Sequence, residues 1–165
     1  MTERIDHPFE PIFDAGARIL ILGTMPSPKS REVRFYYGHP QNRFWRILPE
    51  IFGEKLSDSV DEKTDFLHRH HIALWDVLAS CEIRGADDSS IRNAEPNDLL
   101  MIFSHCPIRA VFTNGQKASD SYRKYFGKCF SVPHISLPST SPANCRNWTY
   151  ETLRDAYRVI TEFTD

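Results

Sequence analysis

Apolar residues occur along this chain in two patterns. Short continuous apolar runs bounded by glycine or polar residues predict buried strands, and they occupy residues 18–22, 72–78, 110–114 and 133–137. Apolar residues recurring at helical spacing predict amphipathic helices, at about residues 42–52, 58–70, 97–104, 116–126 and 147–163. Strands separated by helical segments are typical of βαβ units, which form parallel sheets covered by helices on both faces.

Two segments lack either pattern. Residues 1–16 contain Pro8, Pro11 and Gly16 and are expected to form an irregular entry arm. Residues 80–95 are polar with few large apolar side chains, and we expect a mobile connection there. A length of 165 residues with 41% hydrophobic content fits one globular core. We therefore predict a single α/β domain over residues 1–165, a three-layer sandwich around a four-stranded parallel sheet.

Three of the predicted strands end in unusual sequence. The first runs into Gly23-Thr24-Met25-Pro26, the third ends at Asn114-Gly115, and the fourth is followed by residues 138–142, Pro-Ser-Thr-Ser-Pro. Because parallel strands have their carboxyl ends on one edge of a sheet, these segments are expected to line one ligand crevice.

Charge is unevenly distributed around the first of these segments. The formal net charge of the chain is −2, yet residues 24–46 hold five basic side chains and one acidic one. Such a loop is either a cationic surface for an anionic ligand or simply a solvated segment.

Several classes of chemistry are not supported by the sequence. The four cysteines stand 25, 23 and 16 residues apart, which fits neither a zinc site nor an iron–sulfur cluster, and we expect reduced thiols at Cys81, Cys106, Cys129 and Cys145. Histidines and acids show no ligand spacing, and the first strand end has one glycine where the dinucleotide fingerprint needs three. Ser139 lacks the Gly-x-Ser-x-Gly elbow. We expect no metal and no cofactor.

The N-terminus is charged rather than apolar, and no stretch approaches the roughly 20 apolar residues of a membrane span. The sequence therefore predicts an intracellular, cytoplasmic protein without a membrane partner.

Taken in order, four motifs resemble the uracil-DNA glycosylase superfamily. They are Gly23 to Ser27, Tyr36 to Trp45 (YYGHPQNRFW), Asn114, and Leu137 to Asn144 (LPSTSPAN). Within that superfamily the sequence is most similar to the hypoxanthine (deoxyinosine) DNA glycosylase branch, from residue 18 to the C-terminus. The resemblance implies a monomeric, cofactor-free enzyme that flips a deaminated base out of DNA and hydrolyses its N-glycosidic bond.

The resemblance also locates the catalytic group. Better-known branches carry Asp or Asn before the proline of the first motif to act on water, and here Met25 stands at that position. The branch resemblance moves this role to Asn42, whose amide can orient water. Asn42 is equally suited to be only a helix N-cap. A histidine of many relatives is replaced by Leu137, which puts strong uracil activity in doubt.

By the same resemblance, Gly23, Thr24, Met25 and Pro26 form the floor of a base pocket. Asn114 reads the base edge, although Asn-Gly is also a common turn. One of Tyr36 and Tyr37 faces the base, and we favour Tyr37.

The remaining predicted residues contact DNA. The segment 138–144 presses into the minor groove, with Ser139 and Ser141 on phosphates, a wedge formed by Thr140, Pro142 or Ala143, and Asn144 within the same surface. Further phosphate contacts are expected from Lys29, Ser30, Arg31 and Arg43. The sequence thus favours hypoxanthine removal from deoxyinosine, with a uracil or thymine mismatch glycosylase and a non-catalytic nucleic-acid-binding module as alternatives.

Overall fold

The computed structural model describes residues 2–144 and 146–165. Its central sheet has the strand order β3-β2-β6-β7 and every neighbouring pair is parallel. The strands are β2 (Ile19–Gly23), β3 (Ile72–Asp76), β6 (Ala110–Asn114) and β7 (His134–Leu137). All residues of β2, β3 and β6 are buried, as continuous apolar strands between two helical layers should be. The predicted four-stranded parallel sheet is confirmed.

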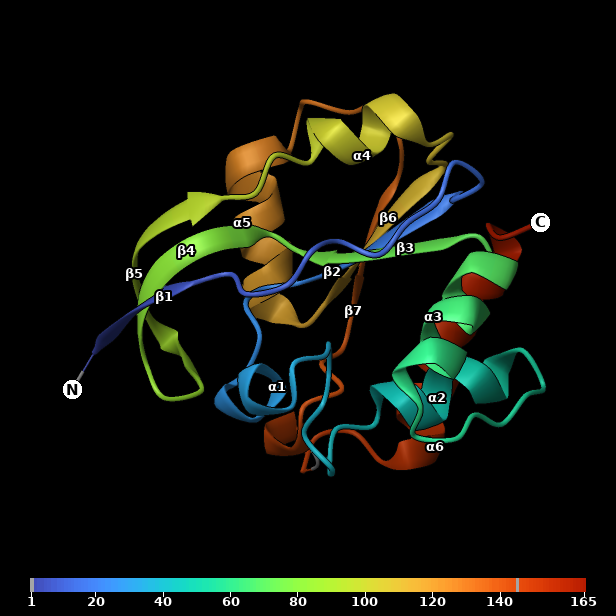
Figure 1. Cartoon of the computed structure of the whole chain (residues 1–165), viewed down its shortest axis with the longest axis horizontal. Coiled ribbons are helices and arrows are strands. Elements are labelled where there is room, and N and C mark those ends of the chain that lie inside the picture. Colours follow the sequence, from blue (N-terminus) through green and yellow to red (C-terminus); the bar gives the residue numbers. More distant parts are fainter. Residues whose placement is uncertain (1, 145) are drawn as a thin grey trace.

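Helices cover both faces of this sheet (Figure 1). α4 (Leu100–His105) and α5 (Gln116–Phe126) lie on one side. The other side carries α2 (Phe44–Ile51), α3 (Val60–Arg69) and α6 (Tyr150–Tyr157). The chain therefore has the three layers expected from its alternating pattern.

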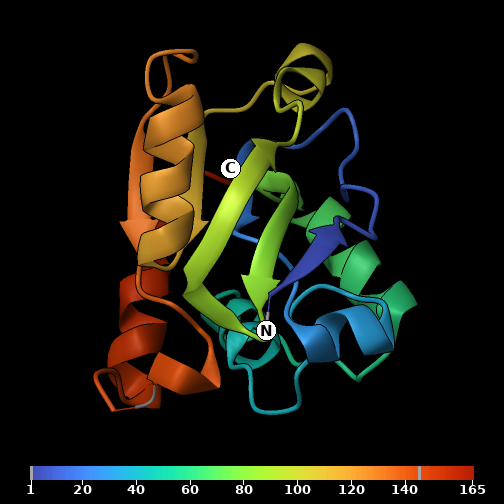
Figure 2. The ribbon, with the colours of Figure 1, turned by 90° about the vertical axis from the view of Figure 1, so that its left-hand side faces the viewer.

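A second, antiparallel sheet was not predicted. It has the order β1-β4-β5 and consists of β1 (Glu3–Asp6), β4 (Leu78–Arg84) and β5 (Asp87–Pro96). In Figure 2, which is turned by 90° from Figure 1, this sheet faces the viewer. The predicted irregular entry arm is wrong for residues 3–6, which form β1, and holds for residues 7–16, where Ile12 forms an isolated bridge. The predicted mobile connection at residues 80–95 is wrong, because β4 and β5 occupy this segment. The hydrophobic pattern did not reveal these strands because β1 pairs with a strand far along the chain and most of β5 is exposed.

Three further local features differ from the prediction: a missed helix, a divided strand and a change of helix type. α1 (Pro28–Val33) was missed; Ser27 caps it by accepting from the Ser30 amide, and proline occupies its first turn. The apolar run 72–78 is divided between β3 and β4. The last helix continues from α6 as the 3-10 helix η2 (Arg158–Glu162).

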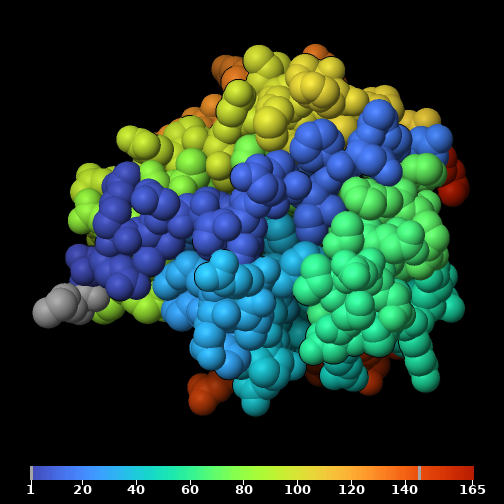
Figure 3. Space-filling view, viewed as in Figure 1, coloured from blue at the N-terminus to red at the C-terminus, as the bar shows by residue number. Residues whose placement is uncertain are grey.

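The N-terminal arm lies across one face of the molecule, above α1 and beside the antiparallel sheet (Figure 3). The backbone of His7 donates to the carbonyl of Ala79 (2.7 Å), and Ile12 forms a bridge with Leu74 in β3. These contacts bring His7 to the carboxyl end of β3.

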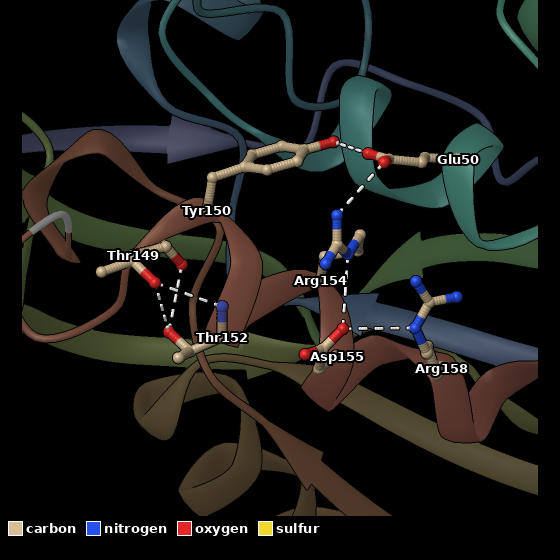
Figure 4. A network of polar contacts seen from close by, with 7 residues as sticks. All are labelled: Glu50, Thr149, Tyr150, Thr152, Arg154, Asp155 and Arg158. Atoms are coloured by element: carbon tan, nitrogen blue, oxygen red, sulfur yellow. Dashed lines mark hydrogen bonds and ion pairs between the residues drawn. The ribbon is translucent and has the colours of Figure 1, made fainter.

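Contacts between α2 and α6 hold the C-terminal end of α2. The Glu50 carboxylate accepts from the hydroxyl of Tyr150 and from Arg154 (3.3 Å), while Asp155 accepts from Arg154 and Arg158 (Figure 4). Exposed ion pairs of this kind contribute little each, so the packing of the fully buried Phe44, Leu48, Leu153 and Tyr157 supplies most of the stabilisation.

Within the described part of the chain, no helix has the length and apolar composition that a membrane crossing requires.

Candidate active site

A cavity of about 280 Å³ opens at the carboxyl edge of the parallel sheet. The chain leaves β2 toward β3 on one side and β6 toward β7 on the other, so the crevice between β2 and β6 is the topological switch point where α/β sheets bind ligands. Its walls include the sequence-predicted residues Gly23, Thr24, Met25, Pro26, Ser30, Tyr37, Asn42, Asn114, Ser139, Thr140, Ser141 and Pro142. The structure thus brings the base-pocket residues and the 138–144 segment to one site.

Gly23 ends β2 at the floor of this cavity. A Cβ atom at this position would lie 2.4 Å from the Asp76 Oδ1 atom and 2.9 Å from the hydroxyl oxygen of Tyr37. Only glycine therefore leaves room for these two polar groups to approach the end of the strand.

Tyr37 is held in an unusual conformation. Its φ angle is +53°, a region that non-glycine residues rarely occupy, and its ring stacks on Phe44 with centroids 4.1 Å apart. The hydroxyl is buried and has no hydrogen-bond partner among the described residues. Burial raises the pKa of Tyr37 well above its ordinary value, and the Asp76 carboxylate raises it further. The group is therefore a neutral donor.

Tyr36 differs from its neighbour. Its hydroxyl donates to the carbonyl of Glu10 in the N-terminal arm (2.8 Å), and its ring packs against Phe9 and Phe35. Although Tyr36 also borders the cavity, its polar group is already occupied. This geometry favours Tyr37 as the residue that faces a ligand.

Asn42 precedes α2 and has two polar groups in different surroundings. Its Oδ1 atom accepts from the amide of Phe44 (2.9 Å), so Asn42 satisfies the first amide of α2 from one residue before the N-cap position, which Arg43 occupies. The side-chain amide nitrogen has no partner within the described residues, and Asn42 lines the cavity. One side chain can therefore cap α2 and still present an amide to a ligand.

Asn114 ends β6 and holds the 138–144 segment in place. Its Nδ2 atom donates to Thr140 Oγ1 and its Oδ1 atom accepts from the Thr140 amide, each at 3.0 Å. The Thr140 carbonyl in turn accepts from the amide of Arg43 (3.1 Å). Since Thr140 is fully buried, it is not placed to form the predicted wedge. An amide has two donors and two acceptor sites, so Asn114 retains one of each for a ligand.

The rest of that segment is ordered by its own side chains. Ser139 Oγ accepts from the Ser141 amide (3.1 Å), Ser141 Oγ accepts from the Ala143 amide (3.3 Å), and Asn144 donates to the Ser139 carbonyl (3.0 Å). Pro142 begins the 3-10 helix η1 (Pro142–Asn144). Pro142 and Ala143 remain as candidates for the wedge.

The predicted phosphate-binding residues separate into two groups. Lys29 is on the surface, paired with Glu32 at 3.3 Å, and Arg31 donates to the carbonyl of Pro26 (2.9 Å). Ser30 is buried and its Oγ accepts from the Gly38 amide (3.0 Å). Arg43 is also buried and donates to the Trp148 carbonyl (2.7 Å). Ser30 and Arg43 therefore face the protein interior. They hold the site together and are not placed to contact a phosphate.

Two features of the cavity were missed from the sequence. Asp76 ends β3 directly beside Gly23, and its Oδ2 atom accepts from His7 Nε2 at 2.7 Å. The tip of the β4–β5 hairpin contributes Gly85, Ala86 and Asp88. A lone carboxylate in the apolar run 72–78 was a usable signal for Asp76, whereas the hairpin tip carried none.

Within residues 2–144 and 146–165, no three His, Cys, Asp or Glu side chains gather as metal ligands. Cys81 and Cys106 are buried thiols and Cys129 is an exposed one. The expectation for Cys145 lies outside the described residues.

Comparison with known proteins agrees with this geometry. A hypoxanthine DNA glycosylase of Methanosarcina acetivorans is 36% identical over 140 residues, covering 84% of this chain and 87% of the relative. A hypoxanthine DNA glycosylase of Methanosarcina barkeri is 37% identical over 114 residues, covering 68% and 72%. A solution NMR structure from M. acetivorans, provisionally described as a uracil DNA glycosylase, superposes with a TM-score of 0.80 at 33% identity, covering 98% of this chain and 99% of that one.

A family model matches residues 10–161, which include every strand of the parallel sheet and the whole cavity wall. The motifs quoted from the sequence all lie within this match. The chain belongs to the uracil DNA glycosylase superfamily.

Proposed function

We propose that this protein is a monofunctional DNA glycosylase that removes hypoxanthine from deoxyinosine and leaves an abasic site. The observation that carries the proposal is the convergence of Gly23, Tyr37, Asn42 and Asn114 on one cavity. Its volume of about 280 Å³ lies at the small end of ligand pockets, which suits one flipped base and not a dinucleotide. The names of the two methanogen relatives support hypoxanthine as that base.

Asn42 is proposed to act on the attacking water. Hydrolysis of an N-glycosidic bond passes through an oxocarbenium-like transition state, in which a positioned water attacks as the base departs. A side-chain amide is not a general base near neutral pH, so Asn42 orients the water through hydrogen bonds. The described residues that line the cavity include no lysine, which favours water over a covalent amine nucleophile.

The surface around the cavity is proposed to bind the DNA duplex. Lys29 and Arg31 are candidates for phosphate contacts, while Ser139 and Ser141 present a pre-ordered segment to the minor groove. We propose that Pro142 or Ala143 fills the gap left by the flipped base. We also propose that the protein acts on cellular DNA as a monomer.

The test uses labelled duplexes that contain deoxyinosine, deoxyuridine, deoxyxanthosine or a G·T mismatch, followed by alkaline cleavage at abasic sites. We expect cleavage at deoxyinosine. The Asn42→Ala variant should lose roughly 10²- to 10³-fold in rate, the range for removing one transition-state contact. Thermal unfolding of the same variant measures the loss of the α2 cap separately.

Other outcomes support other functions. Cleavage only at deoxyuridine or the mismatch would indicate a uracil or thymine glycosylase. Duplex binding without any cleavage would indicate a binding module. If Asn42→Asp stays fully active and Asn42→Ala loses only stability, Asn42 is a cap and not a catalytic residue.

A further inference from the structure

Asp76 is a buried carboxylate that the proposed mechanism does not use. Its side chain is 5% exposed and that of His7 is 4% exposed, and their contact joins the Oδ2 and Nε2 atoms at 2.7 Å. Because a carboxylate can only accept, the Nε2 atom carries the proton in this contact. The ring is held from its other side by the backbone of Phe9, with the Phe9 amide 3.2 Å from Nδ1. His7 therefore fixes one oxygen of Asp76.

The second oxygen of Asp76 is available to a ligand. Oδ1 has no hydrogen-bond partner among the described residues, and Asp76 is part of the cavity wall. This oxygen and the Tyr37 hydroxyl both lie within 3 Å of the point where a Cβ of Gly23 would stand. The cavity floor thus offers an acceptor and a neutral donor close together.

These two groups belong to the end of the cavity that reads the base. Asp76 and Asn114 end the two strands that flank β2, and both line the cavity together with Tyr37. Asn114 is the residue proposed to meet the base edge, whereas Asn42, proposed to meet the water, lies at the start of α2. The position of Asp76 at the end of β3 is therefore suited to recognition of the base.

We propose that Asp76 is a specificity-determining residue: the oxygen that His7 leaves unoccupied accepts a hydrogen bond from the ring N–H that deamination creates. The inference rests on the proposed function. Deamination of adenine or cytosine replaces an amino group by an oxo group and puts a proton on the adjacent ring nitrogen. Tyr37 donates to the oxo group while Asp76 accepts from the N–H.

The same carboxylate rejects the undamaged parent bases. Adenine and cytosine present a nitrogen lone pair at that position, and two acceptors facing each other in a desolvated pocket leave both unpaired. A site built to bond a particular donor discriminates strongly against a base that lacks it. Asp76 therefore distinguishes a deaminated base from its parent by the single proton on the ring nitrogen.

The experiment compares hypoxanthine with purine, the base of nebularine, which has a lone pair at the same ring position and no oxo group. Wild-type protein and the isosteric Asp76→Asn variant are assayed on duplexes holding either base, and kcat/KM is measured for each. The amide of the variant can donate to the lone pair. We expect the hypoxanthine-to-purine ratio to fall by about 10- to 100-fold in Asp76→Asn, the effect of one well-formed base contact.

Glu54→Gln is the matched control, since Glu54 also pairs with a histidine, His70, but does not line the cavity. The hypoxanthine-to-purine ratio of kcat/KM for Glu54→Gln should equal that of wild type. Thermal unfolding checks that each variant is folded, and if Asp76→Asn is not, wild type alone must still discriminate against purine and against 1-methylhypoxanthine, which lacks the N–H.

The outcomes separate the two proposals. An unchanged ratio, or an equal loss on both bases, overturns the role of Asp76 and points to a structural or water-activating carboxylate. Excision of uracil but not hypoxanthine by wild type overturns the proposed substrate only, since uracil carries the same N–H. Uracil and pyrimidin-2-one, which has a lone pair at that ring position, then replace hypoxanthine and purine in the ratio. No excision of any base overturns both.

Discussion

The parallel and the antiparallel sheet both border the cavity, but they contribute to it differently. The parallel sheet supplies the floor, through the last residues of strands that are buried along their whole length. The antiparallel sheet supplies part of the rim, through a hairpin whose tip is exposed. Buried strands hold side chains within narrow limits, whereas exposed hairpin tips open at low free-energy cost. We therefore expect changes in the floor to affect chemistry and changes in the rim to affect binding.

Gly23→Ala should have the largest effect of the variants that test this comparison. The new methyl group would collide with Asp76 Oδ1 and the Tyr37 hydroxyl, which buried packing cannot accommodate without displacement. Displacing groups at the floor by about 1 Å should reduce kcat/KM by at least about 100-fold. The free energy of unfolding should fall by about 1–3 kcal/mol, as for other overpacked core positions. Excision assays and chemical denaturation measure the two effects.

The matched variant in the rim is Gly85→Ala. Gly85 has a φ of +57° and a Cβ there would meet open space, so only the backbone conformation is disfavoured. We expect a loss of about 1 kcal/mol in stability. A fall in kcat/KM as large as that expected for Gly23→Ala would contradict the division between floor and rim.

Tyr37→Phe should have an intermediate effect and should separate activity from stability. The hydroxyl is buried without a partner in the described chain, so its removal should leave the free energy of unfolding unchanged or higher. Activity on deoxyinosine should fall about 10-fold, the value of one lost hydrogen bond to the base.

Tyr36→Phe provides the opposite pattern. It removes a hydrogen bond to the Glu10 carbonyl and should cost about 1 kcal/mol of stability while changing excision little. If Tyr37→Phe were the destabilising variant and Tyr36→Phe the inactive one, the assignment of the two tyrosines would be reversed.

The difference between the two sheets also explains which elements could be predicted from the sequence. β2 and β6 are continuous apolar runs whose identity is decided locally, and the residues that follow them in the chain reach the carboxyl edge by topology alone. The pairing of β1 with β4 joins Ile5 to Cys81, and β5 is mostly exposed. The hydrophobic pattern contains no signal for pairing between strands that lie far apart in the chain and are largely exposed to solvent.

Individual side chains of the site follow the same logic. Asp76 was overlooked because the apolar run continues to Leu78, and only the pairing with Gly23 shows that β3 stops at the carboxylate. Arg43 stands in a cationic segment, yet the turn into α2 directs its guanidinium to the Trp148 carbonyl. Residue type and position predicted which segments meet, but not which way these two side chains face.

Removing the negative charge of Asp88 from the rim should have the smallest effect. Asp88 is an exposed carboxylate at the hairpin tip beside the cavity, where it would repel DNA phosphates. Asp88→Asn should lower the Kd for an undamaged duplex about two- to threefold at low salt and leave kcat unchanged, since an exposed charge acts through a screened field. Fluorescence anisotropy across a salt series measures this, and the difference should vanish as the salt rises. A change in kcat that persists at high salt would place Asp88 with the floor and remove the distinction between the two sheets.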